Sequence, residues 1–165
     1  MVTQEELKKL MNYNPLTGLF TWLVPRGGRA LKGAIAGTIN KGYTDITLKG
    51  KRHGAHRLAF LYMTGKFPKD CVDHIDSDRG NNKWYNLREA TTQQNAWNGK
   101  LKTNNTSGHK NVYWSKSSKK WSVMIRAEGC RKFIGYYRDL NEASSAAATA
   151  RQKYHGEYAR HDDNI

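Results

Sequence analysis

This sequence of 165 residues contains little cysteine and no long apolar run. Its two cysteines, Cys71 and Cys130, are too few for a disulfide framework or a cysteine-rich zinc site. We expect each to be a small buried residue. No apolar stretch approaches the roughly 20 residues that a membrane-spanning helix needs, and the polar, acid-containing N-terminus is not a secretory signal. These absences predict a cytoplasmic protein that is neither secreted nor bound to a membrane.

Acidic residues are also scarce, with 14 Asp and Glu against 28 Lys and Arg, which gives a net charge of +14. A charge of this size attracts polyanions, and nucleic acid is the usual partner because neutralised phosphates release counterions. Anionic lipid is the alternative, but membrane-binding chains normally concentrate basic residues on one amphipathic helix. Here residues 1–98 hold 15 basic and 8 acidic residues, and residues 99–165 hold 13 and 6. This even distribution predicts a nucleic-acid-binding surface along the whole molecule.

Changes in residue pattern along the chain predict an α+β protein with several parts. The alternating residues Tyr43–Leu48, followed by Lys49–Gly50, indicate a hairpin. Leu58 and Leu61 then share one helical face, and Gly65 ends that helix. We expect an N-terminal β-rich, DNA-contacting region of short strands and turns over residues 1–54, a central region over 55–100, a linker over 101–108, a second domain over 109–160 and a tail over 161–165.

The C-terminal third predicts a small sheet covered by one helix. Three short strands are expected over Asn111–Trp114, Trp121–Arg126 and Arg131–Tyr136, because each is bounded by turn residues. A helix with an alanine stripe follows, with Asp139 and Glu142 forming a capping box at its start. Since alanine allows close approach, this helix should pack on one face of a three-stranded antiparallel sheet. The alternation along the middle strand directs Trp121, Val123 and Ile125 toward the helix.

Carboxylates are concentrated in one polar segment of this basic chain, residues 72–95. Asp73 is next to His74, and Asp76 and Asp78 follow closely. A chain that only held DNA would gain nothing from acids that repel phosphate, so the cluster indicates a bound cation or a catalytic role. Turn capping by the acids and burial of the histidine in the core are the structural alternatives for each residue taken singly.

Asp73-His74, Asn86 and Asn95 resemble the HNH motif of the ββα-metal nucleases, with Asn instead of His at the third position. The resemblance implies a central ββα-metal (HNH) nuclease fold over residues 55–100. If the chain is phage-encoded, it also implies action in the cytoplasm of a bacterial host cell. The surrounding order of residues is similar to that of phage-type HNH homing endonucleases: His56-Arg-Leu-Ala, Gly65-Lys-Phe-Pro68, Asn86-Leu-Arg88 and Asn95 to Asn98.

The segment from Thr106 to Trp114, together with Trp121 and Ile134-Gly-Tyr-Tyr137, resembles an AP2 DNA-binding domain. Such a domain is a three-stranded sheet packed on one helix, the architecture that the residue pattern predicts independently. Asn111 stands where the AP2 pattern usually has glycine, and asparagine tolerates unusual backbone angles. The resemblance therefore implies a C-terminal AP2-like domain that targets the chain to DNA.

The HNH resemblance implies hydrolysis of a DNA phosphodiester bond with one divalent cation. Asp73 and Asn95 would ligate this ion, and their hard oxygen ligands suit Mg²⁺ or Mn²⁺; no zinc is expected. His74 would act as the general base. Asn86 would complete the catalytic pair by orienting the histidine through hydrogen bonds.

Each of three further residues near this motif has two possible roles. Asn98 is the alternative to Asn95 as a metal ligand. Asp76 is either an additional acid or a turn cap. His56 is either a buried structural histidine or a phosphate contact near the site.

Basic and aromatic side chains are expected to contact double-stranded DNA. The sheet face opposite the C-terminal helix would read base edges, while neighbouring lysines would hold phosphates. Trp114 either stacks on DNA or fills the core. The loops Arg26–Lys32 and Lys49–Arg57 either grip the DNA backbone or serve solubility alone. The residues expected to bind DNA are Arg57, Arg88, Lys110, Tyr113, Trp114, Lys119, Arg126, Arg131 and Phe133.

Together these observations predict a metal-dependent DNA endonuclease of the homing type that nicks or cuts double-stranded DNA. The alternative is a non-catalytic, sequence-specific DNA-binding or regulatory protein with a degenerate HNH fold. The intact set of Asp73, His74 and Asn95 favours the enzyme. Because nothing in the sequence resembles a dimerisation helix, we expect a monomer.

Overall fold

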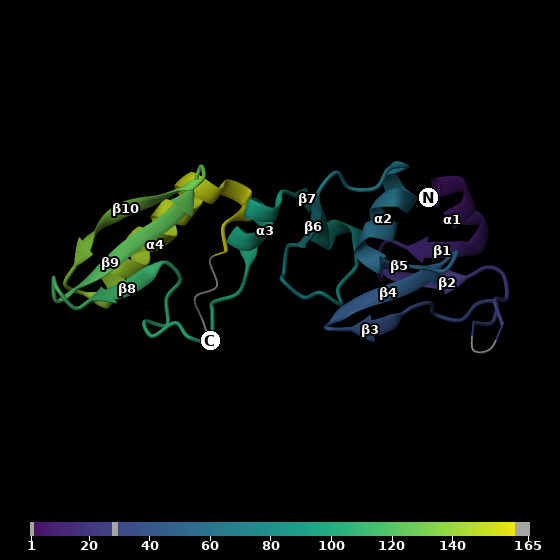
Figure 1. Cartoon of the computed structure of the whole chain (residues 1–165), viewed down its shortest axis with the longest axis horizontal. Helices are drawn as coiled ribbons and strands as arrows, with labels where there is room; N and C mark the ends of the chain where they lie inside the picture. The colour runs from purple at the N-terminus through teal and green to yellow at the C-terminus, as the bar shows by residue number, and fades with distance from the viewer. Residues whose placement is uncertain (1, 28–29, 161–165) are drawn as a thin grey trace. The chain divides into compact units, whose positions relative to one another are not determined.

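The computed structural model describes residues 2–27 and 30–160 as an α+β chain that divides into two compact units, Met1–Asn95 and Ala96–Ile165 (Figure 1). The division follows Asn95, whereas the linker was expected at residues 101–108. Residues 28 and 29 of the expected DNA-contacting loop, and the expected tail 161–165, lie outside the described residues. Within the described ranges, no helix has the length and apolar character needed to cross a membrane.

The first unit joins three small antiparallel sheets and two helices around one core. Its sheets are β1–β2, β3–β4–β5 and β6–β7, and the chain then enters α3. The bounds are α1 Gln4–Leu10, β1 Met11–Asn14, β2 Leu19–Trp22, β3 Thr38–Asn40, β4 Tyr43–Leu48, β5 Lys51–Gly54, α2 Ala55–Thr64, β6 Cys71–His74, β7 Leu87–Ala90 and α3 Thr92–Asn98, with a 3₁₀ turn at Trp84–Asn86.

The core of the first unit contains residues from both sides of the expected boundary at residue 54. Phe20 and Ile46 from the N-terminal strands and Leu58 from α2 are fully buried in one cluster, which also includes Val72 and Leu87 of the β6–β7 pair. Apolar burial of this kind is the main stabilising contribution to a fold. The N-terminal region is therefore part of the same folded unit as the candidate site.

Residues 4–10 form the helix α1, although short strands were expected there. The helix begins with a capping box, in which Thr3 Oγ1 accepts from the Glu6 main-chain N–H at 3.2 Å and the Thr3 N–H donates to the Glu6 carboxylate at 3.1 Å. The Thr-x-x-Glu spacing that produces this box is a known helix-start signal. Leu7 then anchors the helix in the core.

The second unit confirms the expected sheet and helix. Its strands are β8 Val112–Ser115, β9 Lys120–Ala127 and β10 Cys130–Tyr137 in the order β10–β9–β8, and helix α4 Leu140–His155 packs on one face. Val123 and Ile125 lie fully buried beneath this helix. Ala143 and Ala147 are also fully buried, so small side chains lie where the helix packs on the sheet.

Three residues of the second unit show how its backbone and burial relate to the sequence. Asn111 has a φ of +71°, the left-handed conformation that glycine or asparagine adopts most readily. Cys130 is exposed and not buried, because it opens β10 at a hairpin turn. Arg151 is fully buried in α4, and its Nη1 donates to the Lys110 carbonyl at 2.7 Å.

Candidate active site

The motif residues lie on two paired strands and the helix that follows them. Strand β6 ends in Asp73 and His74, and the antiparallel register pairs these with Arg88 and Leu87 of β7. Helix α3 comes directly after β7. This arrangement gives the strand–strand–helix order that the HNH resemblance implied.

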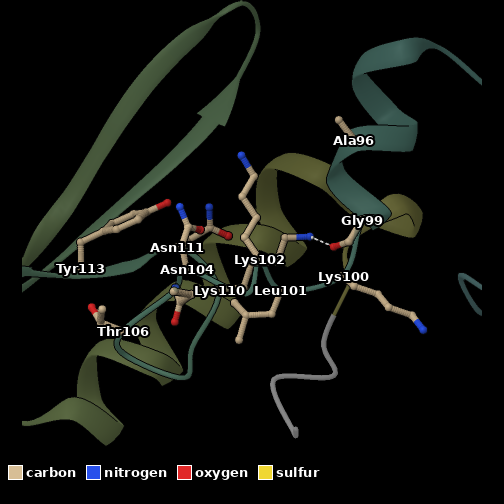
Figure 2. A pocket seen from close by; sticks show the side chains of 11 residues that line it. Ala96, Gly99, Lys100, Leu101, Lys102, Asn104, Thr106, Lys110, Asn111 and Tyr113 are labelled. Carbon is tan, nitrogen blue, oxygen red and sulfur yellow. Dashed lines mark hydrogen bonds between the residues drawn. The ribbon is translucent and has the colours of Figure 1, made fainter.

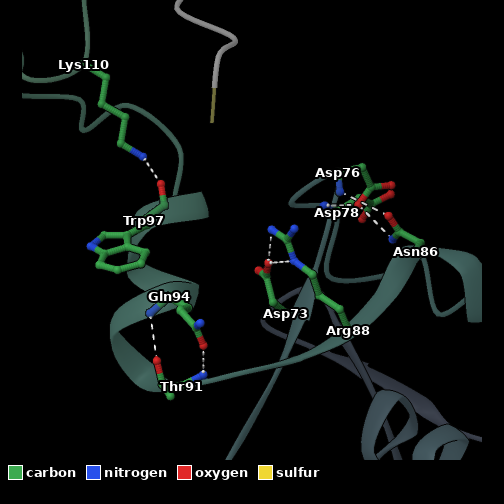
Figure 3. Close-up of polar contacts among 9 residues, drawn as sticks. All are labelled: Asp73, Asp76, Asp78, Asn86, Arg88, Thr91, Gln94, Trp97 and Lys110. Atoms are coloured by element: carbon green, nitrogen blue, oxygen red, sulfur yellow. Dashed lines mark hydrogen bonds and ion pairs between the residues drawn. The ribbon is translucent and has the colours of Figure 1, made fainter. Parts of the chain in front are cut away.

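Asp73 and Arg88 form a buried ion pair, because residues directly opposite in an antiparallel pair point to the same face. Arg88 Nη2 lies 2.7 Å and Nε 2.8 Å from Asp73 Oδ2 (Figure 3). The Asp73 side chain is only 3% exposed and that of Arg88 15%. A carboxylate buried this deeply requires a positive partner, since burial of an unpaired charge is strongly unfavourable.

The loop between β6 and β7 is built around Asp76 and Asn86. Asn86 Nδ2 donates to Asp76 Oδ1 at 2.9 Å and to the Asn81 carbonyl at 2.8 Å, and its Oδ1 accepts from the Asp76 N–H (Figure 3). Asp76 also accepts from the Asp78 N–H at 2.8 Å, as a turn cap does. Burial raises the pKa of Asp76, but hydrogen bonds from Asp78, Asn81 and Asn86 outweigh it and hold the pKa below its ordinary value.

His74 is buried, and its ring orientation is set by Asn82. The His74 Nε2 atom lies 3.2 Å from Asn82 Oδ1. The Asn82 amide nitrogen donates to the Gly80 carbonyl at 3.2 Å, which identifies Oδ1 as the atom that faces the histidine. Because Oδ1 can only accept, Nε2 carries the proton and Nδ1 is the nitrogen that can take one up.

Two aromatic rings lie near His74. The ring centroid of His56 lies 5.3 Å from that of His74, and the Tyr43 centroid lies 6.0 Å away. Burial, together with the charges of His74 and Arg57, lowers the pKa of His56 to about 4. His56 is therefore neutral at neutral pH. Its Nδ1 atom is buried without a hydrogen-bond partner.

Helix α3 begins at a well-defined point. Thr91 and Gln94 form a capping pair, in which the Thr91 N–H donates to Gln94 Oε1 at 2.8 Å and the Gln94 N–H donates to Thr91 Oγ1 at 3.2 Å (Figure 3). The Thr92 N–H donates to the carboxylate of Asp70, which precedes β6. These contacts fix the start of the helix that carries Asn95, which is half-buried, and Asn98, which is buried.

Three residues that support the His74 loop were not expected to take part in the site. Asn82 is the first, and its main-chain carbonyl accepts from the Tyr13 hydroxyl at 2.7 Å. Burial raises the pKa of Tyr13 to about 12, so this phenol stays protonated and donates. Gly18 has a φ of +75°, and a Cβ atom there would lie 2.4 Å from the Asn82 main chain. Only glycine fits this contact.

The residues expected to bind DNA fall into two groups. Tyr113, Arg126, Arg131 and Phe133 are exposed on the sheet face opposite α4, and Lys119 is exposed in the β8–β9 turn. Trp114 is half-exposed and meets Trp121 edge-on, with 5.0 Å between ring centroids.

Three other expected DNA contacts are engaged within the protein. Arg88 pairs with Asp73, as described above. The Lys110 ammonium donates to the main-chain carbonyls of Trp97 and Gly99. Arg57 donates to the Asp70 carbonyl at 2.7 Å and to the Pro68 carbonyl at 3.3 Å. These contacts hold loops and helix ends in place.

The two expected metal ligands, Asp73 and Asn95, both carry oxygen donors. Asp73 offers a buried carboxylate, and in this structure a cationic guanidinium lies against it. Asn95 on α3 offers an amide oxygen, and oxygen ligands of these two kinds suit Mg²⁺ or Mn²⁺. Among the described residues, no group of three or more His, Cys, Asp or Glu side chains is placed to hold a metal ion.

Comparisons with known proteins identify the class to which this chain belongs. A family model described as HNH endonuclease matches residues 53–97, which span β6, β7 and most of α3. Protein 3.8 of Escherichia phage T7 is 38% identical over 106 residues, which cover 64% of this chain and 87% of that protein. An uncharacterized HNH endonuclease, L560, of Acanthamoeba polyphaga mimivirus is 47% identical over 51 residues, 30% of this chain and 27% of that protein.

The chain belongs to the HNH endonuclease family, which is a family of nucleases. A solved structure of the HNH homing endonuclease I-HmuI, from work on its DNA binding and cleavage, aligns over 87% of this chain and 84% of that one. The identity is 21% and the TM-score 0.41.

Proposed function

We propose that this protein is a metal-dependent HNH endonuclease of the homing type, which hydrolyses phosphodiester bonds of double-stranded DNA. The observation that carries the proposal is the contact of 3.2 Å between His74 Nε2, at the end of β6 next to Asp73, and Asn82 Oδ1. A buried histidine held by Asn82 through Nε2 presents Nδ1 as a base. Membership of the HNH endonuclease family supports the same function.

In this proposal His74 takes a proton from the water that attacks the phosphate. A base that is held in one orientation contributes about 10²–10⁴-fold to such a step. Asn86 holds together the loop that supplies Asn82, because its side chain bonds both Asp76 and the Asn81 main chain. Asn86 therefore acts on His74 through the loop.

Asp73 and Asn95 would hold one Mg²⁺ or Mn²⁺ ion in the proposed site. When bound, such an ion supplies stabilisation of the charge that develops on the phosphate and on the leaving oxygen. Arg88 neutralises Asp73 in the structure and must give up part of this pairing to a metal ion. Its release would leave a guanidinium beside the scissile phosphate, where a positive charge is favourable.

The second unit would target the enzyme to DNA as an AP2-like domain. Its sheet presents Tyr113, Arg126, Arg131 and Phe133 away from α4. Arginine and aromatic side chains on an exposed sheet suit base edges in a groove, while the positive field of the chain attracts the phosphates. We propose that the protein acts as a monomer in the cytoplasm of a bacterial host cell.

Cleavage of a supercoiled plasmid in Mg²⁺ or Mn²⁺, with and without chelator, tests this function. The wild-type protein should produce nicked or linear DNA in a metal-dependent way. His74→Ala should reduce the rate by about 10²–10⁴-fold and leave DNA retention nearly unchanged. His53→Gln, which changes a histidine on β5, is the matched control and should cleave normally.

Two outcomes would contradict the proposal. DNA retention by the wild-type protein without cleavage in either metal would favour the non-catalytic DNA-binding alternative. Normal cleavage by His74→Ala would show that another residue is the base.

A further inference from the structure

The segment expected to be a linker is folded against the second unit. Ser107 is buried, and its hydroxyl lies 2.8 Å from the Val112 carbonyl and 2.9 Å from the His109 carbonyl. Asn105 Nδ2 donates to the His109 carbonyl at 3.1 Å, and the Asn105 N–H donates to the Lys102 carbonyl at 2.9 Å. These bonds give the segment one definite shape, so it can form the wall of a binding site.

This folded segment and the start of β8 enclose a pocket of about 490 Å³, which we call the linker pocket (Figure 2). A volume of this size lies within the range of small-ligand sites. No carboxylate is among the described residues that line it. The lining residues that matter here are Lys100, Lys102, Lys110, Asn104, Asn111 and Tyr113.

The lysines of the linker pocket have different tasks. Lys110 donates to the Trp97 carbonyl at 2.5 Å (Figure 3) and to the Gly99 carbonyl at 2.6 Å (Figure 2). It thereby ties the end of α3 to the pocket wall. Lys100 and Lys102 are exposed, and Figure 2 shows their side chains extending from the segment in different directions. Each has a flexible four-carbon stem, so both ammonium groups can turn toward one ligand. Two extended ammonium groups without a neighbouring carboxylate among the lining residues favour an anionic ligand, and phosphate is a standard partner of lysine.

Asn111 gives the pocket a group that can recognise more than charge. Its Oδ1 atom is buried and has no hydrogen-bond partner, although its side chain lines the pocket. An unpaired buried acceptor is unfavourable, so a ligand that donates to it is favoured. Because Oδ1 has no hydrogen bond, rotation of this amide toward the ligand breaks no bond to that atom. Asparagine amides pair well with the amino edge of adenine. Tyr113, which also lines the pocket, offers an aromatic ring on which a base can stack.

From these observations we propose that the linker pocket binds one adenine nucleotide unit. Its phosphate lies against Lys100 and Lys102, its base edge bonds to the Asn111 amide, and its ring stacks on Tyr113. We take the nucleotide to be an unpaired residue of a DNA strand. This part of the inference rests on the proposed DNA binding. A free nucleotide offers the same chemistry, so the experiment separates the two.

The test follows side-chain amide and aromatic signals of the full chain by NMR, in chelator, so that cleavage plays no part. The wild-type protein is titrated with dAMP and, separately, with 2-deoxyribose 5-phosphate. We expect dAMP to shift the Asn104, Asn111 and Tyr113 signals in a saturable way, and the sugar phosphate to bind more weakly without moving Asn111. Equal shifts and affinities for both would overturn the proposal in favour of a phosphate site, and no saturable shift would overturn it altogether.

Variants then assign the contacts. Lys100→Ala combined with Lys102→Ala should weaken dAMP binding by about tenfold or more, while Lys153→Ala on α4 removes one charge elsewhere and should not. Asn111→Gly keeps the positive φ of residue 111 and should remove the preference for dAMP over the sugar phosphate. Equal affinities in the Lys100/Lys102 double variant and in Lys153→Ala, or a preference retained in Asn111→Gly, would contradict the assignment.

A DNA-binding measurement identifies the source of the nucleotide. A duplex with one bulged adenine should bind the wild-type protein more tightly than the fully paired duplex, and Asn111→Gly should abolish this difference. If dAMP binds but the bulge has no effect, the proposal for a DNA strand fails and the pocket serves a free nucleotide. Since these measurements involve binding alone, a failure of nuclease activity leaves their result intact.

Discussion

Asn82 connects His74 to the N-terminal strands of the protein. Its side-chain Oδ1 lies 3.2 Å from His74 Nε2, and its main-chain carbonyl accepts from the Tyr13 hydroxyl at 2.7 Å. The buried Asn82 therefore joins the proposed base to strand β1, whose Tyr13 lies 69 positions before Asn82. The orientation of the histidine depends on the folding of the whole first unit.

Replacement of Asn82 should lower the cleavage rate without preventing DNA binding. In Asn82→Ala, His74 loses the acceptor that fixes its tautomer, and residues that orient a catalytic group in this way typically contribute about 10–100-fold. Asn81→Ala removes a neighbouring amide that bonds Asp76 instead and is the matched control. Plasmid nicking rates and DNA retention measure the effect. An equal loss of rate in both variants would show that the loop acts as a whole and that Asn82 has no particular role.

Loss of Arg88 should destabilise the protein strongly in the absence of metal. Arg88→Ala leaves the buried Asp73 carboxylate without its guanidinium, and a broken buried pair costs about 3–5 kcal/mol. Arg52→Ala breaks an exposed pair with Asp45 at 3.8 Å and should cost less than about 1 kcal/mol. Urea unfolding in chelator measures both free energies.

The same Arg88 variant also tests Asp73 as a metal ligand. Added Mg²⁺ should raise the melting temperature of Arg88→Ala more than that of the wild-type protein, because the ion replaces the missing positive charge. A destabilised variant that does not respond to Mg²⁺ or Mn²⁺ would argue against Asp73 as a ligand.

Gly18 should tolerate substitution much less well than a glycine with the same backbone conformation elsewhere. Gly18 has a φ of +75° and Gly50 one of +74°, but an added Cβ would meet the Asn82 and Lys83 main chain only at Gly18. Gly50→Ala should cost about 1 kcal/mol from backbone strain, and Gly18→Ala about 3 kcal/mol or more. Urea unfolding measures both, and equal losses would show that the contact with the loop carries no energy.

The free energy of unfolding should fall with pH below the ordinary pKa of histidine. The pKa of His56 is lowered from 6.5 to about 4, first by burial and then by the charges of His74 and Arg57, while Asp45 opposes the shift. A lowered pKa of a base means that the unfolded chain binds the proton first, so stability is complete above pH 6.5 and is lost as pH falls toward 4. Each pKa unit corresponds to about 1.4 kcal/mol, so the loss reaches about 3 kcal/mol.

Urea unfolding at pH 7 and pH 4.5 measures this dependence. His56→Leu should reduce the difference between the two pH values, because the titrating ring next to Tyr43 and His74 is gone. An identical pH difference in the variant and the wild-type protein would assign the effect to other groups, such as His155, whose pKa burial also lowers.

The local elements of this protein follow from short-range sequence patterns. The hairpin at Lys49–Gly50, the helix that ends at Gly65 and the C-terminal sheet with its alanine-lined helix all form where the periodicity and turn residues predict them. Even α1, which was not expected, carries a local signal in Thr3 and Glu6. Hydrogen bonds and caps of this kind join residues a few positions apart, so the sequence by itself determines them.

The partners of the motif residues were decided only by the tertiary structure. The sequence context predicts Asp73 and His74 as site residues, but the pairing of Asp73 with Arg88 depends on the register between β6 and β7. The contact between Tyr13 and Asn82, like the burial of Arg151 in α4, depends on how distant segments pack. Local periodicity does not determine which buried polar groups bond to each other. Those partners depend on the packing of distant segments, because each buried donor or acceptor requires a partner in the folded protein.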